Sequence, residues 1–325
     1  MKKEYKILTA ILTAIVVVPV AISTASYFFS GNFHYFNTYF EGNSFNSEHE
    51  SIYIDSIEKI ITPAQYSSTN NYQGGACYNN YYAMVANNFE NILIYDLETN
   101  RLVCTVDNID TAYHNTDYHC NTVAFGNEFY SETDRFPLLY VSMESPKVHS
   151  TLVFRIRKLA GFYGVDLVQT IEFPSSKDSG VYLPNSYIDY EEAAIYYAGY
   201  TNNSYNKADD NYLKYYKFQL PSLEEKTVKL NLSNSLDIFT LPSETATQGG
   251  FISHGYLYQT FAFKSKPMFR IADLENHTVI HEQSLGETTG YYDEFENIAT
   301  YNGRLYGFGI KSFRIVEYSY IVTSK

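Results

Sequence analysis

One pattern recurs along this chain of 325 residues: a short apolar strand, a tight turn and a second strand. Its clearest copy runs from Gln248 to Tyr258 and has His254-Gly255 as the turn. The same step of six residues leads from Gln73 to Asn79-Asn80 and from Glu296 to Asn302-Gly303. Such residue pairs suit tight hairpins, because both turn positions require positive φ angles. The pattern therefore predicts at least three related hairpins.

Two longer units complete the series, one starting at His119 and the other at Pro184-Asn185. Their extra length falls in two loops, 126–136 and 201–211. The units begin near residues 73, 119, 185, 248 and 296, so the steps are 46, 66, 63 and 48 residues. Each step has room for four short strands, which is the content of one propeller blade. We therefore predict an all-β fold, a five-bladed β-propeller.

The ends of the predicted domain, residues 51–325, suggest how the ring closes. The last unit has room for only three strands, near 297–301, 304–310 and 313–318. The alternating strand 52–61 would supply the fourth, and this closure by an N-terminal strand would cover a sheet edge. Two stacked β-sandwich domains would also contain many short strands. The repeated spacing from Gln or Glu to the turn favours the propeller.

Two strand-to-turn runs, Ile94–Thr99 and Ile271–Asn276, contain Asp-Leu-Glu and resemble propeller blades in general. With Gly-Gly and His-Cys-Asn at blade starts, the chain is similar to uncharacterised extracytoplasmic bacterial propellers. The resemblance covers residues 52–325, and it includes no WD dipeptide, kelch signature or calcium-binding repeat. It implies a fold, and it brings no known active residues with it.

The N-terminus has the order of a secretory signal: Lys-rich residues 1–6, an apolar run from Ile7 to about Ile22, then small residues. Residues 1–25 are therefore expected to be a signal peptide or a signal anchor, and residues 26–50 a linker. Both alternatives place the domain outside the cytoplasm, either secreted or membrane-anchored. The only expected contact with a membrane is through this N-terminal segment.

Charge and cysteine content exclude several classes of function. The net charge of −13 and the lack of a basic stripe argue against a nucleic-acid partner. Three cysteines, Cys77, Cys104 and Cys120, lack zinc-like spacing. A bridge between Cys77 and Cys120 is conceivable, although buried thiols are favoured. We expect a monomer that needs neither a metal nor a cofactor.

The start of each innermost strand provides a candidate binding site, because these residues ring one mouth of the channel. The ring would consist of Gln73, His119, Asn185, Gln248 and Glu296. Convergent polar groups at the mouth of a closed β structure form a default ligand site. The structural alternative is that polar strand ends simply satisfy one another. Tyr291 and Tyr292, just before the last unit, are the aromatic pair expected to be exposed, and they join the five ring residues as predicted ligand-binding residues.

These features favour a binding module that recognises a glycan, a peptide or a protein partner at the polar mouth. A second hypothesis is a glycan-active hydrolase or lyase with Glu296 as a catalytic carboxylate. Its further candidate carboxylates are Glu294, Asp293 and Asp189. A third is a scaffold that binds through the loops 126–136 and 201–211. The sequence assigns no catalytic residue, and it lacks a nucleophile elbow.

Overall fold

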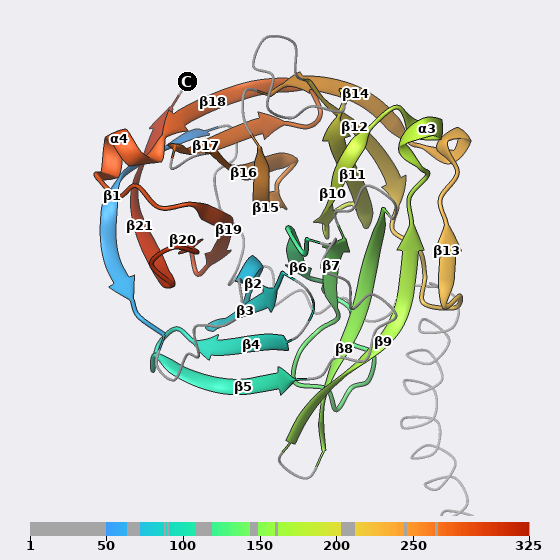
Figure 1. Ribbon diagram of the computed structural model, residues 1–325, viewed down its shortest axis with the longest axis horizontal. Coiled ribbons are helices and arrows are strands. Elements are labelled where there is room, and N and C mark those ends of the chain that lie inside the picture. The colour runs from blue at the N-terminus through green and yellow to red at the C-terminus, as the bar shows by residue number, and fades with distance from the viewer. Residues whose placement is uncertain are drawn as a thin grey trace, which may run out of the picture.

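The computed structural model describes residues 50–63, 72–87, 89, 91–107, 119–143, 149–159, 162–202, 212–243, 246–263 and 266–324. These residues form five β-sheets placed as blades around a central axis (Figure 1). The chain thus folds as the five-bladed β-propeller that the repeat spacing predicts. The predicted signal segment 1–25 and residues 26–49 of the predicted linker lie outside the described residues. Within the described part, no helix is long and apolar enough to cross a membrane.

The first three blades each begin with a strand at the axis and proceed outward. Blade 1 contains β2 (Tyr72–Tyr78), β3 (Tyr81–Ala86), β4 (Asn91–Asp96) and β5 (Arg101–Asp107). Blade 2 contains β6 (Val123–Phe125), β7 (Leu139–Met143), β8 (Ser150–Leu159), β9 (Phe162–Glu172) and, outermost, β13 (Thr227–Lys229). Blade 3 contains β10 (Tyr182–Asp189), β11 (Ala194–Tyr200), β12 (Tyr212–Gln219) and β14 (Asp237–Pro242).

The last two blades bring the ends of the domain together. Blade 4 contains β15 (Thr247–Ser253), β16 (Tyr256–Phe263), β17 (Lys266–Asp273) and β18 (Thr278–Ser284). Blade 5 contains β19 (Phe295–Tyr301), β20 (Arg304–Gly309), β21 (Arg314–Ser324) and β1 (Glu50–Ile61). Helices are short in the described residues: α3 (Ser176–Ser179), the 3-10 turn η1 (Leu232–Asn234) and α4 (Leu285–Thr289).

Strand β1 runs antiparallel to β21 at the outer edge of blade 5 (Figure 1). The pairing extends from Glu50 opposite Ser324 to Ile61 opposite Ile315. Ile52 and Ile54 are fully buried, so one face of β1 packs into the core. Blade 5 therefore combines the first and the last strands of the described chain.

One strand belongs to a different blade from the one its sequence position suggests. Residues 226–230 follow the third strand of blade 3 in the sequence, but β13 pairs in parallel with β9 of blade 2. Lys226 accepts a hydrogen bond from the backbone of Thr170, and Leu230 donates one to Glu172. The outer strand of blade 3 is instead β14. The side chains of β13 are half-buried or exposed, so hydrophobic periodicity carried little information about its partner.

The turns between inner and second strands have the backbone conformation that their residues favour. His254 and Gly255 have φ angles of 52° and 76°, and Asn302 and Gly303 have 50° and 69°. Consecutive positive φ values are typical of the tight turns whose twist matches that of a hairpin. The hairpins predicted at these two positions are confirmed, since Ser253 pairs with Tyr256.

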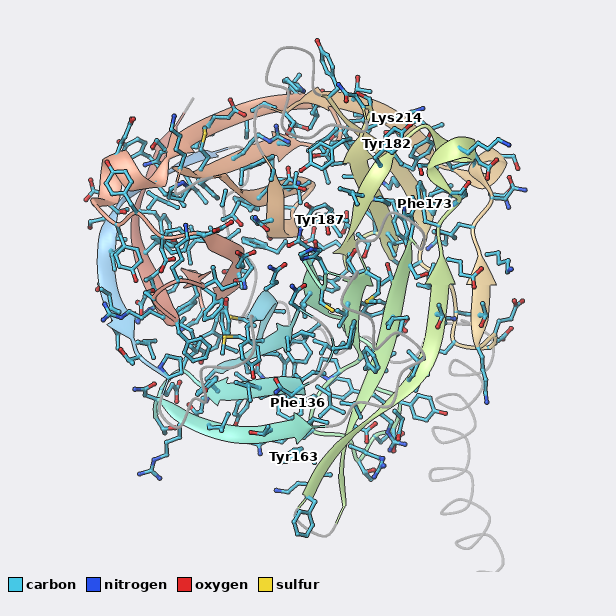
Figure 2. The ribbon with its side chains drawn as sticks, viewed as in Figure 1. Phe136, Tyr163, Phe173, Tyr182, Tyr187 and Lys214 are labelled. Atoms are coloured by element: carbon cyan, nitrogen blue, oxygen red, sulfur yellow. The ribbon has the colours of Figure 1, made fainter. Side chains whose placement is uncertain are left out.

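Aromatic side chains fill the wedges between neighbouring blades. Tyr197 and Tyr216 pack in the cluster between blades 2 and 3, whereas their neighbours Tyr196 and Tyr215 pack toward blade 4. Phe173 stacks on Tyr197 with ring centroids 4.5 Å apart, and Figure 2 shows it between the second and third blades. These tyrosine pairs thus place one ring on each face of their sheet, as alternation along a strand requires.

The three cysteines all lie within the described residues and are buried. No disulfide joins Cys77 to Cys120, and each of the three is present as a thiol. Burial raises the pKa of the Cys104 thiol to about 12, which keeps it protonated and unreactive at neutral pH. The cysteines are therefore part of the core.

Candidate functional site

The axis is lined at one end by residues at or just beyond the positions of the predicted ring. In units 1, 4 and 5 the residues after Gln73, Gln248 and Glu296 are Gly74, Gly249 and Asn297. Asn121 and Asn185 take the corresponding place in blades 2 and 3. All five of these side chains or backbones are buried. The inner layer at this level therefore consists of three asparagines and two glycines.

Hydrogen bonds join the blades around the axis at this level, and one of them crosses it. The amide nitrogen of Asn121 donates to the carbonyl oxygen of Thr247 at 3.2 Å, although blades 2 and 4 are not neighbours. Asn185 donates to the Thr247 hydroxyl at 3.2 Å. On the other side, the backbone of Gly74 donates to Cys120 at 2.9 Å. Polar strand ends here satisfy one another in part, while the side-chain oxygen of Asn185 has no hydrogen-bond partner among the described residues.

A β-bulge recurs near the start of the inner strand in four of the five blades. Strand pairing shifts register near the start of the inner strand in four blades, for example between Tyr72 and Gly75 and between Thr247 and Gly250. The corresponding shifts in the other two blades follow Tyr182 and Phe295. Each shift exchanges inward-facing and outward-facing positions. Alternation counted back from the turn therefore misses the residue that faces the axis.

Position 249 accommodates glycine only, because a β-carbon there would collide with blade 5. A β-carbon at this position would lie 2.5 Å from the Cβ of Asn297 and 2.8 Å from the carbonyl oxygen of Glu296. Gly249→Ala is therefore expected to lower the free energy of unfolding by about 2 kcal/mol, because backbone of blade 5 must move. Gly164→Ala is the control, since there the nearest atom belongs to the end of the Arg157 side chain, at 3.4 Å, and not to the backbone. Chemical denaturation measures the free energy of unfolding of both variants. Equal losses would contradict the close packing of blade 5 against Gly249.

The residues predicted to form the ring have different surroundings. The Gln73 side-chain oxygen and Nδ1 of His119 lie 3.3 Å apart, so these two are brought together. Asn185, Gln248 and Glu296 are buried, with exposed fractions of 0%, 8% and 2%. Ligand binding by this group of five stays a prediction.

The two tyrosines predicted to be exposed differ from each other. Tyr291 is partly buried, and its hydroxyl donates to Ser312 at 2.6 Å. Tyr292 is 59% exposed, with its ring beside Gly286. A role of either tyrosine in binding also stays a prediction.

The carboxylates considered for glycoside hydrolysis have separate structural contacts. Asp293 accepts hydrogen bonds from the backbone of Lys311 and Ser312, and Glu294 pairs with Lys311 at 3.3 Å. Asp189 lies at the far end of its strand, where it accepts backbone hydrogen bonds from the following turn. A catalytic role of these carboxylates stays a hypothesis.

The loop 126–136 packs against blade 2. Arg155 binds Asp134 through two hydrogen bonds of 2.8 Å, and Arg135 donates to Tyr163 at 2.8 Å. Of the second long loop, residues 203–211 lie outside the described residues. Partner binding by either loop remains a hypothesis.

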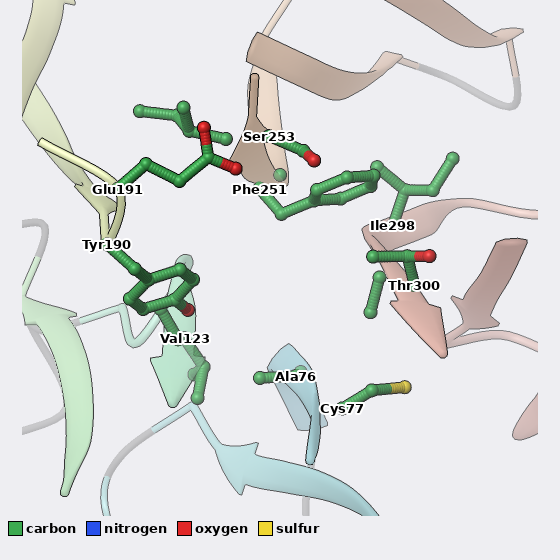
Figure 3. Close-up of a pocket in the computed structure, with 14 residues that line it drawn as sticks. Ala76, Cys77, Val123, Tyr190, Glu191, Phe251, Ser253, Ile298 and Thr300 are labelled. Carbon is green, nitrogen blue, oxygen red and sulfur yellow. The ribbon is translucent and has the colours of Figure 1, made fainter. Parts of the chain in front are cut away.

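A pocket occupies the axis toward the opposite mouth (Figure 3). It encloses about 520 Å³, including the part open to solvent. Residues of the inner strands β2, β6, β15 and β19 form its wall, and the turn after β10 completes it. Figure 3 shows Tyr190 and Glu191 on one side, and Ile298 and Thr300 on the other. None of the seven predicted site residues lines this pocket.

The pocket wall is mainly apolar, and its polar side chains are the Glu191 carboxylate and the hydroxyl groups of Tyr190, Ser253 and Thr300. Ala76, Val123, Phe251 and Ile298 contribute hydrocarbon surface, whereas Glu191 contributes a carboxylate. This composition is typical of small-molecule sites, in which a few polar groups orient a ligand in an apolar cavity. The arrangement can hold a small apolar group and one hydrogen-bond donor.

The β10–β11 turn is held by a buried acid. The Asp189 carboxylate accepts hydrogen bonds from the backbone of Glu191 at 3.0 Å and of Glu192 at 3.2 Å. Burial, with the nearby charges of these two glutamates, raises the pKa of Asp189 to about 6. At neutral pH the ionised carboxylate therefore fixes the turn that presents Tyr190 and Glu191.

Sequence reasoning missed this pocket because it considered only the starts of the inner strands. Phe251 and Ile298 resemble ordinary core residues, and nothing local distinguishes them. One signal was present: blade 3 has Glu191-Glu192 in its inner turn, where units 4 and 5 have His-Gly and Asn-Gly. An acidic pair at a channel mouth is a candidate for ligand contact.

Comparisons with known proteins give structural likenesses only. No family model matches the chain, and no curated protein matches it. Aldose sugar dehydrogenase from Streptomyces coelicolor in its PQQ-bound form is 9% identical, with a TM-score of 0.49, over 84% of this chain and 98% of that one. Glutaminyl cyclase from Myxococcus xanthus is 11% identical with the same TM-score and coverage. BamB from Moraxella catarrhalis is 11% identical, with a TM-score of 0.33, over 79% and 62% of the two chains. At such values, none of these proteins informs the ligand or activity of this propeller.

Proposed function

We propose that this protein is an exported binding module whose ligand occupies the axial pocket. The observation that carries the proposal is the pocket itself, which four inner strands and the β10–β11 turn line together. The glycan, peptide or protein partner considered from the sequence would insert a side chain or ring there. Export is supported by the signal-like order of residues 1–25.

The choice of mouth follows from the hydrogen bonds at the axis. Asn121 and Thr247 join blades across the channel at the end where Gln73 and Glu296 lie. The opposite end has apolar side chains with space between them. Burial of an apolar group there removes hydrocarbon surface from water, which is favourable in proportion to the area.

A neutral apolar probe tests whether the pocket accepts ligands. In methyl NMR spectra, 2-phenylethanol is expected to shift the methyl signals of Ala76, Val123 and Ile298, because these methyl groups line the pocket. A fragment of this size should bind with a Kd of about 1 mM. Phe251→Ala removes one wall and should raise that Kd about fivefold, the equivalent of about 1 kcal/mol of lost apolar contact.

Phe162→Ala is the matched control, because Phe162 is 80% exposed on β9 and lies outside the pocket. It should leave the Kd unchanged. Shifts confined to methyl groups elsewhere, or equal binding by Phe251→Ala and the wild type, would refute binding in the axial pocket.

A further inference from the structure

We propose that the axial pocket selects organic cations, with an ammonium or guanidinium group at Glu191 and an apolar body against Phe251 and Ile298. This inference rests on the proposed function, and it names the class of ligand. Three features support it: the position of the carboxylate, the sign of the surrounding charge and the aromatic residues in the wall.

Glu191 keeps an oxygen available at the edge of the pocket. Its side chain is 37% exposed. Among the described residues, both of its contacts use Oε1, which accepts the backbone N–H of His254 at 3.2 Å and lies 3.8 Å from Nδ1 of that histidine. Nδ1 of His254 also lies 2.9 Å from the Ser253 hydroxyl. Oε2 can therefore accept a hydrogen bond from a ligand.

No lysine or arginine is present in the described lining of the pocket to neutralise this carboxylate. The neighbouring Lys217 pairs with Glu192 instead. A cation in the pocket would gain a charge-assisted hydrogen bond, whereas a carboxylate would be repelled.

The surrounding face adds negative potential. In blades 1 and 4, the turn between the third and fourth strands lies beside the turn between the first and second strands. The backbone N–H of Leu97 donates to the carbonyl oxygen of Asn80 at 2.8 Å, and that of Leu274 donates to Gly255 at 3.0 Å. These outer turns contribute Glu98 and Glu275, both exposed. With a net charge of −13 on the chain, the field attracts cations toward a mouth lined by acids.

Aromatic rings complete the arrangement. Tyr190 and Phe251 both line the pocket, and a cation over the face of such a ring is attracted by its quadrupole. One face of Phe251 stacks on Tyr258 with ring centroids 4.7 Å apart, which holds its orientation. A carboxylate together with aromatic faces is the chemistry that recognises alkylammonium groups.

Two probes that differ in charge test the inference. We would measure the Kd of 2-phenylethylammonium and of 2-phenylethanol by methyl NMR at pH 8, where an ordinary imidazole is neutral. Wild-type protein should bind the ammonium about tenfold more tightly than the alcohol. Glu191→Gln should remove this preference, so that the two probes bind with similar Kd values. Glu192→Gln, which removes an equal charge outside the pocket, should retain the preference.

The outcomes separate the two proposals. Equal affinity of the wild type for both probes would overturn cation selectivity while leaving the pocket as a binding site. A preference that survives in Glu191→Gln would also overturn it, because the charge of the whole face would then be the cause. Absence of binding by either probe would refute both the inference and the proposed function.

Discussion

Replacing Arg270 with alanine is expected to lower the free energy of unfolding by about 4 kcal/mol. Arg270 lies on β17 and is 1% exposed. Its guanidinium donates to the carbonyl of Pro242, to the Tyr215 hydroxyl at 3.3 Å and to the Gln259 side-chain oxygen at 3.1 Å. It also lies 4.4 Å from the centre of the Phe261 ring. Truncation would leave a cavity, and the Pro242 carbonyl and the buried Gln259 side-chain oxygen would each lose a donor.

The contribution of the Arg270 hydrogen bonds to stability can be separated from the contribution of its side-chain volume. Arg270→Met keeps most of the volume and removes the hydrogen bonds, so it should cost about 2 kcal/mol, between wild type and alanine. Arg101→Ala, at an exposed position on β5, should stay within about 0.5 kcal/mol of wild type. Urea denaturation of the four proteins measures these differences. A loss below about 1 kcal/mol for Arg270→Ala would show that the neighbouring groups repack or find water.

The blade count was predictable because the information is local. Turn pairs such as His254-Gly255 favour positive φ in any context, and their spacing marks each hairpin independently of its neighbours. Strand β13 was not predictable in the same way. Its partner β9 lies in another unit, and the pairing depends on an edge that exists only after blade 2 has formed.

The site was less predictable than the fold. Register shifts such as that between Tyr72 and Gly75 exchange the faces of the inner strand, so a period of two does not reveal which residue faces the axis. The pocket wall consists of the same residue types as the core. The burial of Glu128 and Arg270 was also not predictable from the sequence, because an isolated charged residue is usually solvated. Both are buried here.

Glu128→Gln is expected to stabilise the protein at pH 8 by about 3 kcal/mol. Glu128 is in the loop after β6 and is 7% exposed. Among the described residues, its Oε2 has no hydrogen-bond partner. Burial without a compensating charge raises the pKa of this carboxyl from 4.5 to about 7. The folded protein therefore favours the protonated form, and glutamine keeps that neutral shape at every pH.

The pH dependence of the stability difference distinguishes the ionisation of Glu128 from any effect of the substitution that does not vary with pH. Below pH 4.5 the carboxyl is protonated in both the folded and unfolded chains, so its burial carries no ionisation cost. As the pH rises toward 7, the unfolded chain ionises first and wild-type stability falls. The advantage of Glu128→Gln should grow from about 1 kcal/mol at pH 5.5 to about 3 kcal/mol at pH 8. Glu132→Gln, at an exposed position in the same loop, should show no such growth in urea denaturation. An advantage of Glu128→Gln that is constant with pH would mean that Glu128 ionises normally in the folded protein, and that the loop opens to water around it.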